Sequence, residues 1–313
     1  MKKRSSHITR FTLNKQALDM ARIAFLTMDS LADFVSYDQL VVDQLRESGV
    51  SVDEISWRAP GVDWNRYLLV VIRSPWDYQQ DPVAFLQVLD RIQHSQTVLL
   101  NSLDVVRWNI RKYYLRDLEQ QGVRIVPTLW LESPGPADLD GAFDRLQTDE
   151  LVGKPLIGAN ADHAWRLHRS TPRAEFDSAV SAWRGTTALI QPFVPSILDI
   201  GEFSLIYFEG RFSHAIRKIP ASGDFRVQEE HGGQIEACSA AADLLELAEA
   251  CLRAVPERLL YARIDLVRLP NGQPAVMEAE LIEPSLYLAF DADSPARFAA
   301  AIQRRIAVLS DQS

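Results

Sequence analysis

Short continuous apolar runs alternate along the chain with longer segments in which apolar residues recur with helical spacing. The run RIAFLT at residues 22–27 predicts a strand, and YDQLVVDQLRESG at 37–49 predicts a helix that ends at Gly49. The run YLLVVI at 67–72 predicts a strand buried on both faces, as in a parallel sheet. This alternation of strand-like and helix-like segments indicates an α/β protein.

The middle of the chain predicts a long helix followed by a pair of strands. The segment DVVRWNIRKYYLRDLEQQG predicts one helix that begins near Ser102 or Asp104 and ends at Gly122. The segment LVGKPLIGANADHAWRL, from Leu151, predicts two strands joined by a loop rich in small residues. Lys154 lies inside the first of these strands, where an unpaired lysine is costly to bury.

Two tight turns in the C-terminal third predict antiparallel hairpins. One turn is expected at Glu209 and Gly210, and the other at Asn271 and Gly272. A helix rich in Ala and Leu, at about 240–254, precedes the second hairpin. The second turn makes RIDLVRL and AVMEAEL neighbouring strands.

The stretch VMEAELIEPS carries three carboxylates, Glu278, Glu280 and Glu283, within a strand-like pattern. Side chains alternate between the faces of a strand, so Glu278 and Glu280 point the same way. The hairpin places Asp265 opposite them, and three carboxylates converge on one face. Such a group requires a basic side chain, solvent or a divalent cation between its members.

Two loops carry candidate binding residues. In RSPWDYQQDP, beyond the carboxyl end of the buried strand, Arg73 is a candidate ligand for a carboxylate, Trp76 an apolar wall, and Asp77 a ligand for an amine. A proline turn with an aromatic cap explains the same residues equally well. The small-residue loop through Gly158, Ala159 and Asn160 could cover phosphates with its N–H groups, although alone it more often has a purely structural role.

Length and charge narrow the class of protein. A chain of 313 residues, 47% apolar and 24% charged, suits a globular protein of two or three subdomains. Its net charge of −9 argues against a general binder of nucleic acid or membrane surfaces. Residues 1–19 are expected to form a disordered basic leader, and Met20 is an alternative start. No secretory signal, membrane span or metal-type cysteine pattern is present, so the cytoplasm is the expected compartment.

The carboxylate residues identify a family resemblance. Arg263 and Asp265, followed thirteen residues after the Asp by Glu278 and Glu280, resemble the metal-binding motif of the ATP-grasp superfamily of carboxylate–amine ligases. In D-alanyl-D-alanine ligases and their relatives this motif binds two Mg²⁺ ions that bridge the ATP phosphates. The resemblance implies that Asp265, Glu278 and Glu280 are metal ligands. Glu280 stands where the family usually has Asn, but it remains an oxygen ligand suited to Mg²⁺.

Other segments resemble the same superfamily and imply further roles. Lys112 and Lys154 match the two lysines that hold the ATP phosphates, beside Gly158 in the small-residue loop. QPFV resembles the hinge that lines the adenine, and Glu202 lies where an acidic residue commonly meets the ribose. HAIRKIPASGDFRVQEEHGG resembles a loop of the ribosomal-protein glutamate ligases, which implies that Lys218 and Arg226 face phosphates and substrate. The hinge residues concerned are Gln191, Phe193 and Val194.

The resemblance implies an α+β ATP-grasp fold: a parallel α/β domain at 20–104, then subdomains at 105–190 and 191–313 that clasp ATP between them. It also implies ATP- and Mg²⁺-dependent activation of a small carboxylate as an acylphosphate for attack by a nitrogen nucleophile, with Arg263 stabilising the oxyanion. Superfamily members are often dimers, so a homodimer is expected by analogy.

Two features bear on the substrate. RSPWDY and EAELIEPSLYL resemble the cyclo-ligase of D-cycloserine biosynthesis, which closes O-ureido-D-serine, more than glutathione synthetase. Ser285 replaces a common Gly and implies a different pocket floor. The alternatives are a ligase of amino acids or peptides, and a module that binds ATP without turnover. Because all the expected catalytic positions are filled, the second alternative is disfavoured.

Overall fold

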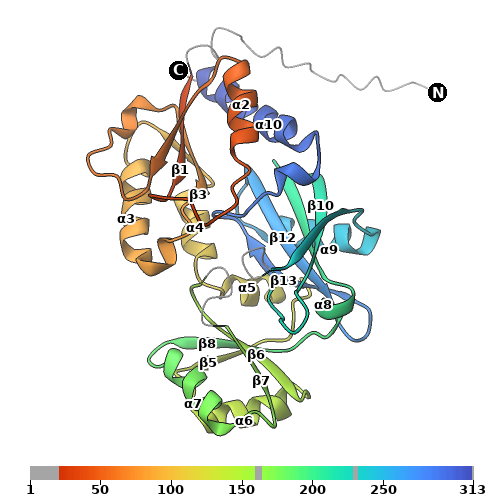
Figure 1. The fold of residues 1–313 in the computed structure, drawn as a ribbon. Coiled ribbons are helices and arrows are strands. Elements are labelled where there is room, and N and C mark those ends of the chain that lie inside the picture. Colours follow the sequence, from red (N-terminus) through yellow and green to blue (C-terminus); the bar gives the residue numbers. More distant parts are fainter. Residues whose placement is uncertain (1–20, 159–163, 228–231, 312–313) are drawn as a thin grey trace, which may run out of the picture.

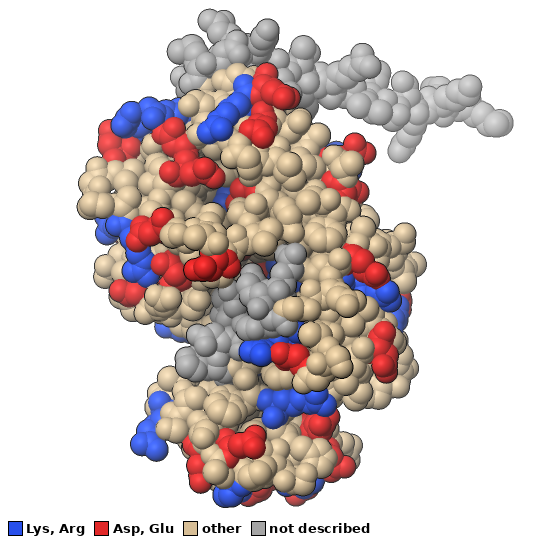
Figure 2. Space-filling model, in the orientation of Figure 1, with Lys and Arg blue, Asp and Glu red and all other residues tan. Residues whose placement is uncertain are grey.

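The computed structural model describes residues 21–158, 164–227 and 232–311, and it contains three sheets that follow one another along the chain (Figure 1). The predicted leader 1–19, the alternative start Met20, and Ala159 and Asn160 lie outside the described residues. On the face shown in Figure 2, the described acidic and basic side chains are interspersed.

The N-terminal sheet is parallel, with strand order β2-β1-β3-β4. Its strands are β1 (Arg22–Thr27), β2 (Ser51–Ser56), β3 (Leu69–Ser74) and β4 (Val98–Leu100), and its helices are α2 (Gln39–Glu47) and α3 (Pro82–Gln93). The predicted strand 22–27 and the parallel sheet are confirmed. Strand β3 is buried at all six positions, as its apolar run predicts, but it begins two residues later and continues through Arg73 and Ser74. It can do so because both polar side chains have partners inside the protein, Asp38 and Thr27.

The middle sheet is antiparallel and has the order β5-β8-β6-β7. Its strands are β5 (Leu129–Glu132), β6 (Glu150–Pro155), β7 (Trp165–His168) and β8 (Thr187–Pro192). Helices α6 (Pro136–Arg145) and α7 (Arg173–Ala182) lie together on one face of it (Figure 1). The two strands predicted around the small-residue loop are therefore confirmed as the pair β6 and β7.

The C-terminal sheet is antiparallel, with order β11-β10-β9-β12-β13. Its strands are β9 (Glu202–Phe208), β10 (Arg211–Ile219), β11 (Gln234–Cys238), β12 (Tyr261–Arg268) and β13 (Pro274–Glu280), and its helices are α8 (Ser196–Asp199) and α9 (Ala242–Ala254). Both predicted hairpins are confirmed. Glu209 and Gly210 have φ of 50° and 75°, the left-handed conformation that this two-residue turn requires. The second hairpin pairs Asp265 with Glu278.

The single helix predicted after Ser102 is wrong, because the chain forms two helices, α4 (Leu103–Asn109) and α5 (Tyr114–Gln120). Ser102 does cap the first, accepting a hydrogen bond from the Val105 N–H. Between the helices, the N–H of Lys112 donates to the carbonyl of Leu156 at 2.9 Å. Lys112 therefore lies in the interruption and next to the middle sheet.

The C-terminal helix α10 (Ser294–Ser310) lies against the N-terminal domain, where it packs beside α2 (Figure 1). One apolar core joins Phe25 of β1, Val41 of α2 and Ile302 of α10 with Phe208 and Tyr261 of the C-terminal sheet. This shared core fixes the parallel sheet against the sheet that carries the carboxylates. No helix in the described part of the chain has both the length and the apolar character needed to cross a bilayer.

Candidate active site

Two adjoining cavities contain most of the residues that the sequence predicts. The larger cavity lies at the end of the hairpin where β12 begins and β13 ends, next to the interruption between α4 and α5, and the smaller lies beside β8. The predicted residues that line the larger cavity are Trp76, Lys112, Lys154, Gly158, Glu202, Lys218, Arg263, Asp265, Glu278, Glu280 and Ser285. The smaller cavity shares Lys154 and Glu202 with it and is also lined by Gln191, Phe193, Val194 and Arg226. Of the predicted site residues, only Arg73 and Asp77 line neither.

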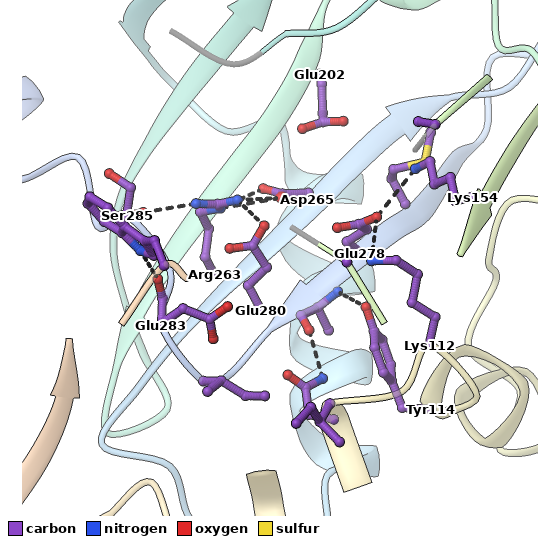
Figure 3. A pocket seen from close by; sticks show the side chains of 18 of the residues that line it. Lys112, Tyr114, Lys154, Glu202, Arg263, Asp265, Glu278, Glu280, Glu283 and Ser285 are labelled. Atoms are coloured by element: carbon purple, nitrogen blue, oxygen red, sulfur yellow. Dashed lines mark hydrogen bonds and ion pairs between the residues drawn. The ribbon is translucent and has the colours of Figure 1, made fainter. Parts of the chain in front are cut away.

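Arg263 lies at the centre of the carboxylate group (Figure 3). Its guanidinium donates to Asp265 at 3.0–3.2 Å and to Glu280, and its Nη1 donates to the backbone oxygen of Ser285 at 3.1 Å. Burial alone would raise the pKa of Asp265, but Arg263 and Lys218 outweigh it and hold the pKa below its ordinary value. Burial and the neighbouring carboxylates Asp265 and Glu278 raise the pKa of Glu280 to about 7, against the attraction of Arg263.

Glu278 is shared by two lysines from different parts of the chain. Its Oε1 lies 3.1 Å from Lys112 Nζ and 3.3 Å from Lys154 Nζ. Burial would raise the pKa of Glu278, but the two ammonium groups together hold it well below its ordinary range. The geometry brings both predicted phosphate lysines to one point.

Lys218 forms a second buried pair on the other side of Asp265. Its Nζ lies 2.5 Å from Glu202 and 3.5 Å from Asp265, and its side chain is 3% exposed. Burial would lower the pKa of Lys218, but Asp265 and Glu202 raise it overall. Gly201 makes this pair possible, because it has φ of 89° and a Cβ there would lie 2.8 Å from the Lys218 backbone oxygen.

The smaller cavity is mostly apolar and has few polar groups. Val194, Val227 and Met277 belong to one apolar cluster at its wall. Arg226 at its edge is held by Asp224, with Nη2 and Oδ2 2.8 Å apart. A mostly apolar cavity beside a cluster of lysines suits the base and the phosphates of a nucleotide.

The end of the larger cavity near Ser285 contains a carboxylate that the predicted site omits, Glu283. Figure 3 shows it beside Glu280 and Ser285, away from Lys112 and Lys154. Burial and the nearby Glu280 raise the pKa of Glu283 to about 8.

Other cavity residues lie outside every motif used in the prediction. Asn109 donates to the Ala279 carbonyl and accepts from the Leu281 N–H, and Tyr114 accepts from the Ala279 N–H. These bonds hold β13 against the α4–α5 interruption. Only a contact between segments far apart in the chain reveals them, so no local signal could have identified these residues.

The interpretation of Arg73 and Asp77 as substrate ligands does not fit their surroundings. Arg73 is 2% exposed and forms a buried ion pair with Asp38 at 2.9 Å. It also donates to the carbonyl of Pro284 at 3.3 Å. Asp77 accepts from Trp57 Nε1 at 2.6 Å and from Arg58 Nε at 2.8 Å. Both side chains therefore make contacts within the protein outside the cavity. Trp76, by contrast, lines the cavity.

We therefore expect Arg73→Met to lower the free energy of unfolding by about 3–5 kcal/mol, because it leaves Asp38 buried without its counter-ion. Thermal and urea unfolding measure this loss. The double variant Asp38→Asn/Arg73→Met should recover part of it, since it removes both charges. A single variant that melts like the wild type but has lost turnover would restore the substrate role of Arg73.

The donor set fits a divalent metal by type. Asp265, Glu278 and Glu280 present carboxylate oxygens to one cavity, which Mg²⁺ prefers. Among the described residues, no three metal-binding side chains form a preformed metal site. Basic side chains lie between the carboxylates instead. Mg²⁺ needs only one or two protein carboxylates when phosphates and waters complete its shell.

Comparison with known proteins identifies the family. The family of the D-cycloserine synthetase DcsG N-terminal domain matches residues 23–101. The cycloserine biosynthesis protein DcsG of Streptomyces lavendulae is 33% identical in an alignment 302 residues long that covers 91% of this chain and 99% of that protein. The crystal structure of D-cycloserine synthetase DcsG has a TM-score of 0.81 at 32% identity, covering 91% of this chain and 100% of that one. The ATP-grasp ligase PsnB shares the fold, with a TM-score of 0.63 at 17% identity over 90% of this chain and 99% of that one. The chain therefore belongs to the family of the cycloserine biosynthesis protein DcsG and is an ATP-dependent carboxylate–amine ligase with the ATP-grasp fold.

Proposed function

We propose that this ligase activates the carboxylate of a small amino-acid derivative as an acylphosphate, and that a nitrogen of the same molecule then closes a ring. The observation that carries the proposal is one cavity in which Lys112, Lys154, Lys218 and Arg263 surround three carboxylates on a β-hairpin. Transfer of phosphate to a carboxylate brings two anions together, so a cavity with this density of cations suits it.

ATP would span the two cavities. Its base would lie against Gln191, Phe193 and Val194, with Glu202 near the ribose, and its phosphates would reach Lys112 and Lys154. Lys154 lines both cavities, which supports a ligand that extends from one to the other. Gly158, which lines the larger cavity, and Arg226, which lines the smaller one, would also contact the phosphates.

Asp265, Glu278 and Glu280 would hold Mg²⁺, two ions by analogy with the superfamily, together with the phosphates. Bound there, Mg²⁺ neutralises charge on the phosphates during transfer. The lysines and Arg263 pair with the same carboxylates and hold the pKa of Asp265 and of Glu278 below its ordinary value, whereas the pKa of Glu280 is raised to about 7. When ATP binds, its phosphate oxygens would replace Glu278 as the partners of Lys112 and Lys154.

The reaction follows in two steps. A carboxylate oxygen of the substrate bonds to the γ-phosphorus, the bond to the bridging oxygen breaks, and ADP leaves. The substrate nitrogen then attacks the carbonyl carbon and loses a proton to solvent, and phosphate leaves. Arg263 would stabilise the oxyanion of the second step, since its guanidinium reaches both the metal carboxylates and the Ser285 end of the cavity. Lys218, fixed by Glu202, would add positive charge beside it.

The substrate would be O-ureido-D-serine or a close relative, because the DcsG family is named for D-cycloserine synthesis. Trp76 and Ser285 would form the substrate end of the cavity. One cavity that holds both reacting groups suits ring closure within one molecule.

The test is a screen for ADP release from ATP with O-ureido-D-serine, D-serine or D-alanine as single substrates, with and without Mg²⁺. We expect Mg²⁺-dependent release with O-ureido-D-serine alone and formation of a cyclic product by mass spectrometry. Release only when a second amino acid is added would instead indicate a ligase that joins two molecules. ATP binding without release for any compound would indicate a binding module.

A further inference from the structure

One acidic side chain of the cavity has no counter-ion among the described residues. Five acidic side chains line the larger cavity, and four basic ones face them. Glu202, Asp265, Glu278 and Glu280 each form an ion pair with one or two of these cations. The remaining acid is Glu283, for which the described residues include no basic partner. Within the part of the chain that the structure describes, Glu283 therefore has no counter-ion at the Ser285 end of the cavity, and its pKa is raised to about 8.

The backbone around Glu283 is fixed by three side chains, two from strands β3 and β12 and one from the loop after β3. Trp76 Nε1 donates to the carbonyl of Glu283 at 2.8 Å. Arg73 donates to the next carbonyl, that of Pro284, and the hydroxyl of Tyr261 donates to the preceding one, that of Ile282, at 2.7 Å. Three consecutive carbonyls are thus held by donors, which is the kind of support that keeps a binding side chain in position.

The side chain of Glu283 points into the cavity, which Tyr78 also lines, and the Tyr78 hydroxyl is near enough to the Glu283 carboxyl to lower its pKa against the effect of burial. Tyr78 is itself buried, 5% exposed, so this hydroxyl cannot turn to solvent. A carboxylate and a hydroxyl that converge at the end of an apolar wall form a small site for a group with several N–H donors and a positive charge.

We propose that Glu283, assisted by Tyr78, binds the α-ammonium group of the substrate. The inference rests on the proposed function, because it places the amine of the amino-acid derivative at one end of the cavity and the reacting carboxylate toward Arg263. It also replaces Asp77 as the ligand for an amine, since Asp77 is bonded to Trp57 and Arg58 outside the cavity. A bound ammonium group favours the ionised form of Glu283 and pairs with it, so compounds without that group are discriminated against.

The test compares two compounds that differ only in the amine: O-ureido-D-serine, and 3-(ureidooxy)propanoic acid, which lacks it. ADP release is measured for both, with saturating ATP and Mg²⁺, on the wild type, Glu283→Gln and Tyr78→Phe. Asp77→Asn is the matched control, because it removes a carboxylate near the same loop but outside the cavity. Melting temperatures of all variants show whether each is folded.

The wild type should prefer the amine compound by about ten- to a hundredfold in kcat/KM, as a charged hydrogen bond is worth that much. Glu283→Gln should remove most of this preference through a higher KM for the amine compound alone. Tyr78→Phe should reduce the preference by a smaller factor, and Asp77→Asn should retain it. Equal losses for both compounds in Glu283→Gln, or an unchanged preference, would overturn the amine site. If neither compound releases ADP from the wild type, the proposed substrate class is wrong, and this inference falls with it.

Discussion

Glu278→Gln is expected to lower Mg²⁺-dependent turnover by about 10²–10³-fold and also to lower the melting temperature of the protein without nucleotide or metal. The first effect follows from loss of charge where the phosphates and metal are bound. The second follows because Lys112 and Lys154 both depend on this carboxylate. Their attraction outweighs its burial, as the lowered pKa of Glu278 requires. Its removal leaves two ammonium groups close together without a counter-ion.

The pH dependence of this stability effect has a definite sign. A carboxylate whose folded pKa is lowered stabilises the protein above its unfolded pKa, here 4.5 for Glu278. The melting temperatures of wild type and Glu278→Gln should therefore differ most above about pH 5 and converge as the pH falls below 4.5. Glu236→Gln, an exposed partner of Arg217, is the matched control and should change stability by less than about 1 kcal/mol.

Glu280→Gln should lose turnover as well, yet its stability should move the opposite way. Burial and two neighbouring carboxylates raise the pKa of Glu280 to about 7, so ionising it costs free energy in the folded state. That cost is complete above pH 7, falls as the pH decreases toward 4.5, and is absent below it. The variant should therefore melt higher than the wild type at pH 8. If both variants melt lower by the same amount, the proposed difference between the two glutamates is wrong.

The hairpin motif could be predicted from the sequence because its information is local. A two-residue turn sets the register of two adjoining strands, and side chains alternate between faces, so Asp265 and Glu278 had to meet. The basic side chains between the carboxylates were only partly predictable. The resemblance marked Lys112 and Lys154 for phosphates, but nothing local shows that both reach the same Glu278 oxygen before ATP is present.

Two departures from the prediction come from contacts between distant segments, and a third comes from where a strand ends. Arg73 follows the predicted strand 67–72, at a position where ligands commonly bind, but it lies within β3 and pairs inside the protein with Asp38, 35 residues earlier. The helix after Ser102 is interrupted where its side chains and backbone bond to β13 and to Leu156, and helical periodicity contains no sign of these partners. Glu283 was recognised as a third carboxylate but lies beyond the end of β13, so strand alternation could not assign it a face.

Arg263→Lys should lower kcat by about 10²–10³-fold and leave the KM for ATP nearly unchanged. One guanidinium donates to Asp265, to Glu280 and to the Ser285 carbonyl, and a single ammonium group cannot reach all three in that geometry. Both residues carry the same charge, so ground-state attraction for the phosphates persists while the oxyanion loses an aligned donor.

The matched control for this last variant is Arg268→Lys, on the same strand β12 but outside the cavity, where Arg268 pairs with Asp243. It should retain wild-type kinetics. Steady-state kinetics with the ADP assay, and single-turnover measurements that separate phosphoryl transfer from product formation, distinguish the two steps. A normal first step with a slow second step places Arg263 at the oxyanion, because phosphoryl transfer precedes attack by the nitrogen. If Arg263→Lys instead raises the KM for ATP at constant kcat, its role is in holding the nucleotide, and the oxyanion assignment is wrong.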